Sequence, residues 1–358
     1  MTSRAVNRFC ELLGLEHPVV QGPFGGGMSS VALASAVSDA GGLGSFGAHH
    51  LQPDAVAGVV KELRAATDRP FAVNLWVPQE GEREVRATAA DVERLRPYYE
   101  EFGLPVPSTE RRPQPDFDDQ VDALLAAGPP AISLVMGLPP ERLVAEARRR
   151  GIVLIGTATT VAEAEALERA GADVVVASGS DAGGHRGAFL APVRESLVGT
   201  FALVPQVADA VRVPVVAAGG ITDGRGMAAA LVLGADAVQI GTGFLACAES
   251  GASEVHRRAL LSPEARTTVL TRLFSGRTAR GVANRFVREM AAHEEDVPAY
   301  PAQNALMLPL RAEAAARGRS DLVNLWSGQA AGLAVGGPAA DYLSSLLADA
   351  GLLLGRRL

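Results

Sequence analysis

One histidine of this chain lies where its imidazole could take part in catalysis. His185 is the only one of six histidines that falls inside a glycine-rich segment, SGSDAGGHRG (178–187). A neutral imidazole can accept or donate a proton near physiological pH. We therefore predict that His185 is catalytic. The alternative is a histidine that only orients its loop or contacts a bound molecule.

Two residue pairs farther along the chain, each containing glycine, have the character of an anion-binding site. Gly219-Gly220 follows the apolar run VPVVAAGG (213–220), and Gly241-Thr242 follows AVQIGTG (237–243). Glycines at such positions let backbone N–H groups approach an anion closely, and a helix starting behind them adds partial positive charge. The two pairs together predict a grip on the phosphate of a cofactor or substrate.

Eight short apolar runs must position these residues. Each run is almost continuously hydrophobic, as expected of a parallel strand that is buried on both faces. The runs span 18–23, 42–48, 71–78, 131–137, 152–158, 173–179, 213–220 and 237–243.

Segments of helical period separate the runs, and we predict helices at 28–40, 53–67, 160–170 and 223–234. A strand–helix unit repeated eight times predicts an α/β fold, either a closed (β/α)8 TIM barrel or a doubly wound sheet. Eight units favour the barrel, in which the loops after the strands form the active face.

Two parts of the chain depart from this repeat. Residues 79–116 are charged and rich in proline, and they predict an insertion after strand three that is partly helical. This insertion is either a lid or a solvated surface elaboration. Helical patterns near 253–262, 278–292, 302–317 and 335–352 predict a C-terminal extension. We expect a barrel over 1–250 and, packed on it, a helical extension over 251–358.

Composition excludes several classes of function. The 358 residues are 48% hydrophobic and carry a net charge of -7, with no basic stripe for nucleic acid. No apolar stretch is long enough to span a membrane, no secretion signal is visible, and Cys10 and Cys247 are too few for a disulfide framework. A cytoplasmic protein is therefore expected. The sequence contains no zinc-binding motif and no cluster of carboxylates after the strands, so no metal site is predicted.

The motifs together resemble those of class I nitronate monooxygenases, formerly called 2-nitropropane dioxygenases. The resemblance covers nearly the whole chain, and its most specific segments are AGGHRG (182–187) and QIGT (239–242). Other matching segments are PVVQGPFGGGM (18–28), FAVNLWVP (71–78), YPAQNALMLPLRAEAAARG (300–318) and NLWSGQAAGLA (324–334).

This resemblance implies an FMN-binding barrel that oxidises nitronates, and possibly nitroalkanes, with O2 to a carbonyl compound and nitrite. It implies that His185 handles the substrate proton or the nitronate anion. It also implies a set of flavin contacts: Gln21, Gly22, Pro23, Phe24, Asn74, Ser178, Gly183, Gly184, Gly219, Gly220, Gln239, Ile240, Gly241 and Thr242. The expected partners are a small-molecule substrate and O2, in a monomer or homodimer.

Three positions differ from the family pattern. Gln21-Gly22-Pro23-Phe24 stands where Gln-Ala-Pro-Met is common, Ser178 where Gln is common, and Gly243 where Arg or Ala is common. These differences affect the tuning of the flavin and the choice of substrate rather than the fold. Two other functions stay open: an NAD(P)H-dependent flavin reductase of enoyl thioesters or quinones, and a phosphate-binding barrel without flavin.

Overall fold

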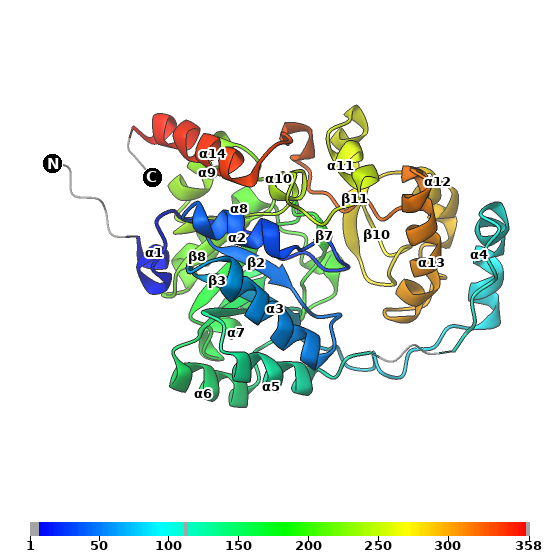
Figure 1. Cartoon of the computed structure of the whole chain (residues 1–358), viewed down its shortest axis with the longest axis horizontal. Helices are drawn as coiled ribbons and strands as arrows, with labels where there is room; N and C mark the ends of the chain where they lie inside the picture. Colours follow the sequence, from blue (N-terminus) through cyan, green and yellow to red (C-terminus); the bar gives the residue numbers. More distant parts are fainter. Residues whose placement is uncertain (1–6, 111–113, 356–358) are drawn as a thin grey trace.

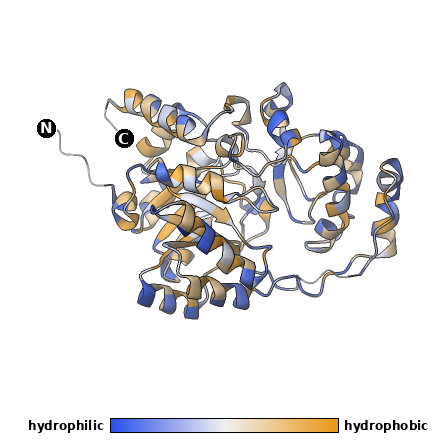
Figure 2. Ribbon diagram, in the orientation of Figure 1, coloured by the Kyte–Doolittle hydropathy of each residue, from blue (hydrophilic) through white to orange (hydrophobic). Residues whose placement is uncertain are grey.

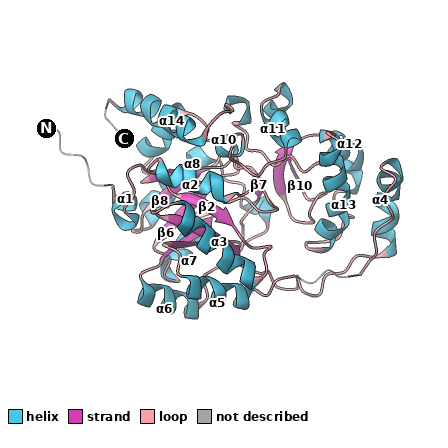
Figure 3. Cartoon of the chain, in the orientation of Figure 1, coloured by secondary structure: helices cyan, strands magenta, loops and turns pink. Residues whose placement is uncertain are grey.

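Eight parallel strands form the centre of the molecule, surrounded by helices (Figures 1 and 3). The structure is a computed structural model that describes residues 7–110 and 114–355. All eight apolar runs form the predicted strands. These are β1 (Val19–Gln21), β2 (Gly44–Gly47), β3 (Phe71–Trp76), β4 (Ala131–Val135), β5 (Val153–Ala158), β6 (Val174–Ser178), β8 (Val215–Ala218) and β9 (Ala237–Ile240).

The sheet closes on itself into a barrel. Its strand order is β1-β9-β8-β6-β5-β4-β3-β2. A parallel bridge between Val20 and Leu43 joins the two end strands, and the Gln21 N–H donates to the Leu43 carbonyl over 3.0 Å. The predicted (β/α)8 TIM barrel is therefore confirmed. Because all the strands run in the same direction, their carboxyl ends share one rim.

Helices alternate with the strands and cover the outside of the barrel. Figure 2 shows hydrophilic residues on the outer turns of these helices, most clearly at α5 and α6. Among the described residues, no helix has both the length and the apolar character needed to cross a membrane. The helices are α2 (Val31–Asp39), α3 (Pro53–Ala66), α5 (Phe117–Ala127), α6 (Glu141–Arg150), α7 (Val161–Arg169), α8 (Thr200–Ala210), α9 (Gly224–Val232) and α10 (Thr242–Leu245).

The inside of the barrel is filled by small and branched side chains. Val20, Ala72, Ile155 and Val216 belong to this inner cluster. Helix α1 (Arg8–Leu13) contributes the wholly buried Phe9 to the same cluster. The barrel is therefore a packed core, and a reaction can take place only at its open rim.

The insertion and most of the C-terminal part form a second packed body beside the rim. It contains α4 (Ala89–Glu101), α11 (Glu254–Leu260), α12 (Arg285–Met290) and α13 (Ala302–Ala316), with short 3₁₀ turns at 263–266, 291–293, 320–322 and 331–333. Figure 1 shows α4 beyond α13, at the end of two long connections from the barrel. The last helix, α14 (Ala339–Leu354), instead packs on α9 and α2 of the barrel.

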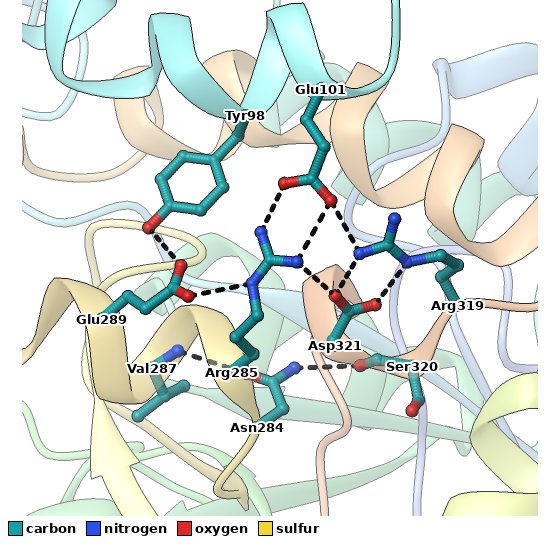
Figure 4. A network of polar contacts seen from close by, with 9 residues as sticks. All are labelled: Tyr98, Glu101, Asn284, Arg285, Val287, Glu289, Arg319, Ser320 and Asp321. Atoms are coloured by element: carbon teal, nitrogen blue, oxygen red, sulfur yellow. Dashed lines mark hydrogen bonds and ion pairs between the residues drawn. The ribbon is translucent and has the colours of Figure 1, made fainter.

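A network of charges holds α4 against the rest of this second body (Figure 4). The Glu101 carboxylate pairs with Arg285 at 2.5 Å and with Arg319 at 2.7 Å. Both arginines also pair with Asp321. The hydrogen bond from Arg285 is the main reason that the pKa of Glu101 falls to about 2. The insertion is thus anchored at its helix, far from the rim.

The prediction of a helix over 278–292 is wrong in its first half. Residues Ala279–Val282 form β11, which pairs antiparallel with β10 (Thr268–Thr271), and the helix begins only at Arg285. Gly281 disfavours a helix, and a Cβ there would lie 2.8 Å from the Leu325 carbonyl oxygen. The Asn284 side chain then caps α12 by accepting the Val287 N–H. The close packing of Gly281 against the backbone of Leu325 therefore outweighs the helical pattern of the local sequence.

Glycine 44 lets α2 pack directly on β2, which gives a test of the packing. A Cβ at Gly44 would lie 1.9 Å from the Ala34 carbonyl oxygen, whereas a Cβ at Gly58, within α3, would meet nothing within 4 Å. We expect Gly44→Ala to lower the free energy of unfolding by about 3 kcal/mol. Gly58→Ala should raise it by about 0.5–1 kcal/mol. Urea denaturation measures both values, and equal effects would contradict the packing described.

Candidate active site

The parallel register gathers most of the predicted site residues at one rim. Gln21 lies opposite Ile240, Ala218 opposite Gln239, and Ser178 opposite Ala218. Asn74 ends the same layer on β3, where it lies opposite Gly47 and Ser133. The loops that follow these strands therefore face a common space above the barrel.

A glycine cradle lies after β8 and β9. Gly219 and Gly220 have φ values of +104° and +69°, a backbone conformation that favours glycine. Within 7–110 and 114–355, no acceptor takes the N–H of Gly219, Gly220 or Gly241. A Cβ at Gly219 would approach the Ala182 nitrogen to 2.9 Å, so the loop after β6 closes over this cradle. Unpaired N–H groups in a glycine-lined hollow suit a phosphate.

A segment of the second body, between its turns at 320–322 and 331–333, adds another wall to the cradle. Gly328 donates its N–H to the Thr242 hydroxyl over 2.9 Å, and the Gln329 N–H donates to the Asp181 carbonyl over 2.9 Å. A Cβ at Gly183 would lie 2.4 Å from the Gly328 nitrogen, so these two chains touch. Thr242 and Gly183 therefore lie side by side although 59 residues separate them in sequence.

Several predicted side chains are engaged within the protein. The Gln21 amide oxygen accepts the Ser45 N–H over 2.9 Å, and the Asn74 amide donates to the Ser133 hydroxyl over 3.0 Å. Ile240 is wholly buried in the core, so only its backbone can reach the rim. The Phe24 ring lies beside Gly241, at 3.7 Å from the position of an added Cβ. The remaining members of the predicted set at this rim are Gly22, Pro23, Ser178, Gly184 and Gln239.

His185 is fixed over the rim by strand pairing. It ends β7 (Gly184–His185), which pairs antiparallel with β11, so that His185 lies opposite Ala279. The preceding loop is held by Arg186, whose buried guanidinium donates to the carbonyls of Ser178 and Gly179 over 2.9 and 2.7 Å. Arg186 therefore positions the loop.

One serine determines which nitrogen of His185 carries the proton. His185 Nε2 lies 2.8 Å from Ser275 Oγ, and that hydroxyl lies 3.0 Å from the Arg277 carbonyl oxygen. The Arg277 N–H also reaches the hydroxyl, over 3.3 Å. All three contacts are satisfied when Ser275 donates to the carbonyl and accepts from Nε2–H. His185 Nδ1 is then left as an acceptor, and among the described residues nothing bonds to it.

Both tryptophans of the chain pack edge-on against His185. The ring centroids of Trp76 and Trp326 lie 4.9 and 5.3 Å from that of the imidazole. His49 stacks flat on Trp76 at 3.7 Å, and its Nδ1 is buried without a partner. His256 holds Trp326 in place through a contact of 3.0 Å between Nε2 and the Trp326 carbonyl oxygen. His185 therefore sits in an aromatic cage.

Burial keeps His185 uncharged near neutral pH. It lowers the pKa of His185 to about 3, and the nearby positive charge of Arg311 adds to the effect. Burial also lowers the pKa of Arg277 and of Arg311 to about 10, so both remain cations at neutral pH. Tyr300 lies between them, with the Arg277 guanidinium carbon 4.9 Å from its ring. The site thus combines a neutral base with two buried cations.

Sequence reasoning did not assign the residues around His185. Trp76 lies within the predicted strand 71–78 and ends the observed β3, and a tryptophan near a strand's carboxyl end is a signal that could have pointed to the site. Tyr300, Arg311 and Trp326 fall in segments that matched the family, without a role attached to them. Ser275 carried no such signal. His49, in the loop after β2, also stacks within the cage. Among the described residues, no three His, Cys, Asp or Glu side chains could hold a metal ion.

Known proteins share this architecture and sequence. A model of the nitronate monooxygenase family matches residues 7–349. A probable nitronate monooxygenase of Staphylococcus aureus (strain Newman) is 40% identical over 346 residues, which cover 95% of this chain and 96% of the relative. A probable nitronate monooxygenase of Staphylococcus saprophyticus is 41% identical over 324 residues, which cover 90% of this chain and 91% of the relative.

Two solved structures extend the likeness to three dimensions. Nitroalkane oxidase from Streptomyces ansochromogenes superposes with a TM-score of 0.89 at 38% identity, covering 97% of this chain and 99% of that one. FabK from Thermotoga maritima superposes with a TM-score of 0.77 at 31% identity, covering 98% of both chains. The chain therefore belongs to the nitronate monooxygenase family and is a flavin-dependent oxidoreductase.

Proposed function

We propose that this protein binds FMN and oxidises nitronates with O2 to a carbonyl compound and nitrite. The observation that carries this proposal is the neutral His185 imidazole, which is held by Ser275 beside a glycine cradle and has the buried cation Arg311 nearby. Positive charge near a neutral base favours an anionic substrate such as a nitronate. We expect this chemistry to take place in the cytoplasm.

The residues at the rim suit a flavin that carries a single phosphate. The N–H groups of Gly219, Gly220 and Gly241 have no acceptor in the described protein and would bind the phosphate. The bound flavin would supply the electron-accepting group of the reaction. We assign the lining of its ring and chain to the rest of the set at this rim: Gln21, Gly22, Pro23, Phe24, Asn74, Ser178, Gly183, Gly184, Gln239, Ile240 and Thr242.

His185 has two roles in this proposal, according to the substrate. With a neutral nitroalkane, the unprotonated Nδ1 would remove the proton next to the nitro group. With a nitronate, which has already lost that proton, the imidazole would orient the anion. Burial, helped by the positive charge of Arg311, holds the pKa of His185 down, so the imidazole stays unprotonated at neutral pH. Ser275 is a positioning residue, because it fixes the ring through Nε2.

A second candidate function is reduction of an enoyl thioester or quinone with NAD(P)H. The likeness to FabK over 98% of the chain favours it. Both candidates need the same cradle and cage. They differ in the co-substrate, since the first consumes O2 and the second consumes NAD(P)H.

The first prediction of the proposed function concerns the cofactor. The purified protein should be yellow and should release FMN on denaturation. Gly219→Ala should lower the flavin content several-fold, because its Cβ would press on the Ala182 nitrogen at 2.9 Å. Gly151→Ala is the matched control: Gly151 has a φ of +68° as the C-cap of α6 and is not part of the rim. Flavin absorbance per chain measures both. Equal retention in both variants would rule out the Gly219 cradle.

The second prediction concerns His185. We expect His185→Asn to keep its flavin and to lose about 100-fold or more in kcat/KM with a neutral nitroalkane. The loss with the matching nitronate should be smaller, because no proton has to be removed. In the unmodified protein, kcat/KM with the nitroalkane should show no His185 inflection near pH 6.5, since its pKa is about 3. Equal losses with both substrates would contradict a role as base.

The third prediction separates the two candidate functions. Oxygen uptake should follow addition of an alkyl nitronate without NAD(P)H. In the same preparation, NADH and NADPH should be stable in the presence of an enoyl thioester or a quinone. Rapid loss of NAD(P)H, with no oxygen uptake from nitronates, would replace the first function by the second.

A further inference from the structure

The insertion places one carboxylate inside the active site. Glu82 pairs through Oε1 with the Arg277 guanidinium, and its Oε2 accepts the Gln79 N–H over 3.2 Å. The side chains of Glu82 and Arg277 are only 18% and 13% exposed, so the pair is largely removed from water. Arg277 therefore has a carboxylate partner that comes from the insertion, in the segment that precedes α4.

Arg277 is next to the proposed reaction centre. Its backbone shares the Ser275 hydroxyl with His185, through contacts of 3.0 Å to its carbonyl and 2.8 Å to the imidazole. Its guanidinium carbon lies 5.6 Å from the Trp76 ring and 4.9 Å from the Tyr300 ring. An arginine held over aromatic rings is a preorganised binder of planar anions.

The charges around Arg277 do not balance. Arg311 is a second buried cation, and its guanidinium donates only to Asn304, at 2.7 and 3.3 Å, within the described part of the chain. Glu82 is the one carboxylate that pairs with either arginine in that part. Two cations with one carboxylate leave room for a further negative charge, or for an exchange of Glu82 with another anion.

The turn that carries Glu82 is held by few contacts. Its backbone bonds run from Glu82 N–H to the Gln79 carbonyl (3.3 Å) and from Glu84 N–H to the Gly81 carbonyl (3.1 Å). Gly81 has a φ of +77° and would meet nothing within 4 Å with a Cβ added. The Gln79 amide also contacts the carbonyl of Met136, the one described non-glycine residue with a positive φ (+71°). The strained Met136 thus lies where this turn meets the rim.

We propose that Arg277 is an anion-binding subsite of the active site, that Glu82 fills it in the resting protein, and that a small planar monoanion takes its place. The Glu82 carboxylate is itself such an anion. Identification of the natural ligand as a nitronate rests on the proposed function, whereas the exchange of anions does not. Displacement of Glu82 also breaks its bond to the Gln79 N–H, so the turn 79–84 moves when the subsite is filled.

Titration of the flavin-loaded protein with nitrate tests this proposal without turnover. Nitrate is a planar monoanion, and its binding can be followed by fluorescence of the two tryptophans, Trp76 and Trp326, which both line the site. Glu82→Gln removes the internal competitor, so the Kd for nitrate should fall about tenfold or more. Glu84→Gln removes the same charge from the same turn, where Glu84 is exposed, and should change Kd by less than about twofold.

A double-variant cycle identifies Arg277 as the group that Glu82 occupies. In an Arg277→Gln background, Glu82→Gln should no longer tighten nitrate binding, because the shared partner is gone. Where Arg277→Gln does not fold, Arg277→Lys replaces it, and the gain from Glu82→Gln should then shrink. If Glu82→Gln binds nitrate no more tightly than Glu84→Gln, or if its gain persists unchanged in either background, the subsite is disproved.

Cleavage by trypsin gives an independent readout of the turn. Arg83 directly follows Glu82, Arg86 lies three residues farther along, and both are exposed. Saturating nitrate should speed cleavage at both residues in the unmodified protein, and Glu82→Gln should be cleaved fast without nitrate. If neither nitrate nor Glu82→Gln changes the rate of cleavage, the proposed displacement of Glu82 is wrong. Absence of nitronate turnover alongside the expected nitrate results would reject the proposed function and leave the subsite standing.

Discussion

The pairing of β7 with β11 is the constraint on which the site depends. Gly184 and His185 form a strand only because β11, from the C-terminal part, offers them a partner. That pairing brings Ser275 to Nε2 of His185 and sets Trp76 and Trp326 against its ring. The barrel thus provides the rim, and the C-terminal part determines how the histidine is presented over it.

This division explains how far the sequence could predict the structure. The eight barrel strands were predictable because each is a buried apolar run, and all but β3 have glycine at or near their ends. A strand of two residues has no pattern of its own, and β11 contains Gly281, so the small sheet could not be inferred locally. The structure corrected one expected helix at this point, over the residues of β11.

The same reasoning applies to the site. Gly219 and Gly220 could be found from the sequence because their positive φ values favour glycine over other residue types. Ser275 and Arg277 could not, since their roles arise from contacts with His185 and Trp76 that lie about 90 and 200 positions away in sequence. The structure also shows why the loop tolerates Ser178, which differs from the family pattern. Its carbonyl, rather than its side chain, bonds to Arg186, so the loop is held whatever side chain stands at this position.

The electrostatic state of His185 is the central claim of this account. Histidine-selective ¹⁵N NMR of the flavin-loaded protein measures it directly. The account predicts a neutral His185 with its proton on Nε2 from about pH 8 down to about pH 5, since its pKa is about 3. Protonation of His185 with a pKa near 6.5, or a proton on Nδ1 of the neutral ring, would contradict it.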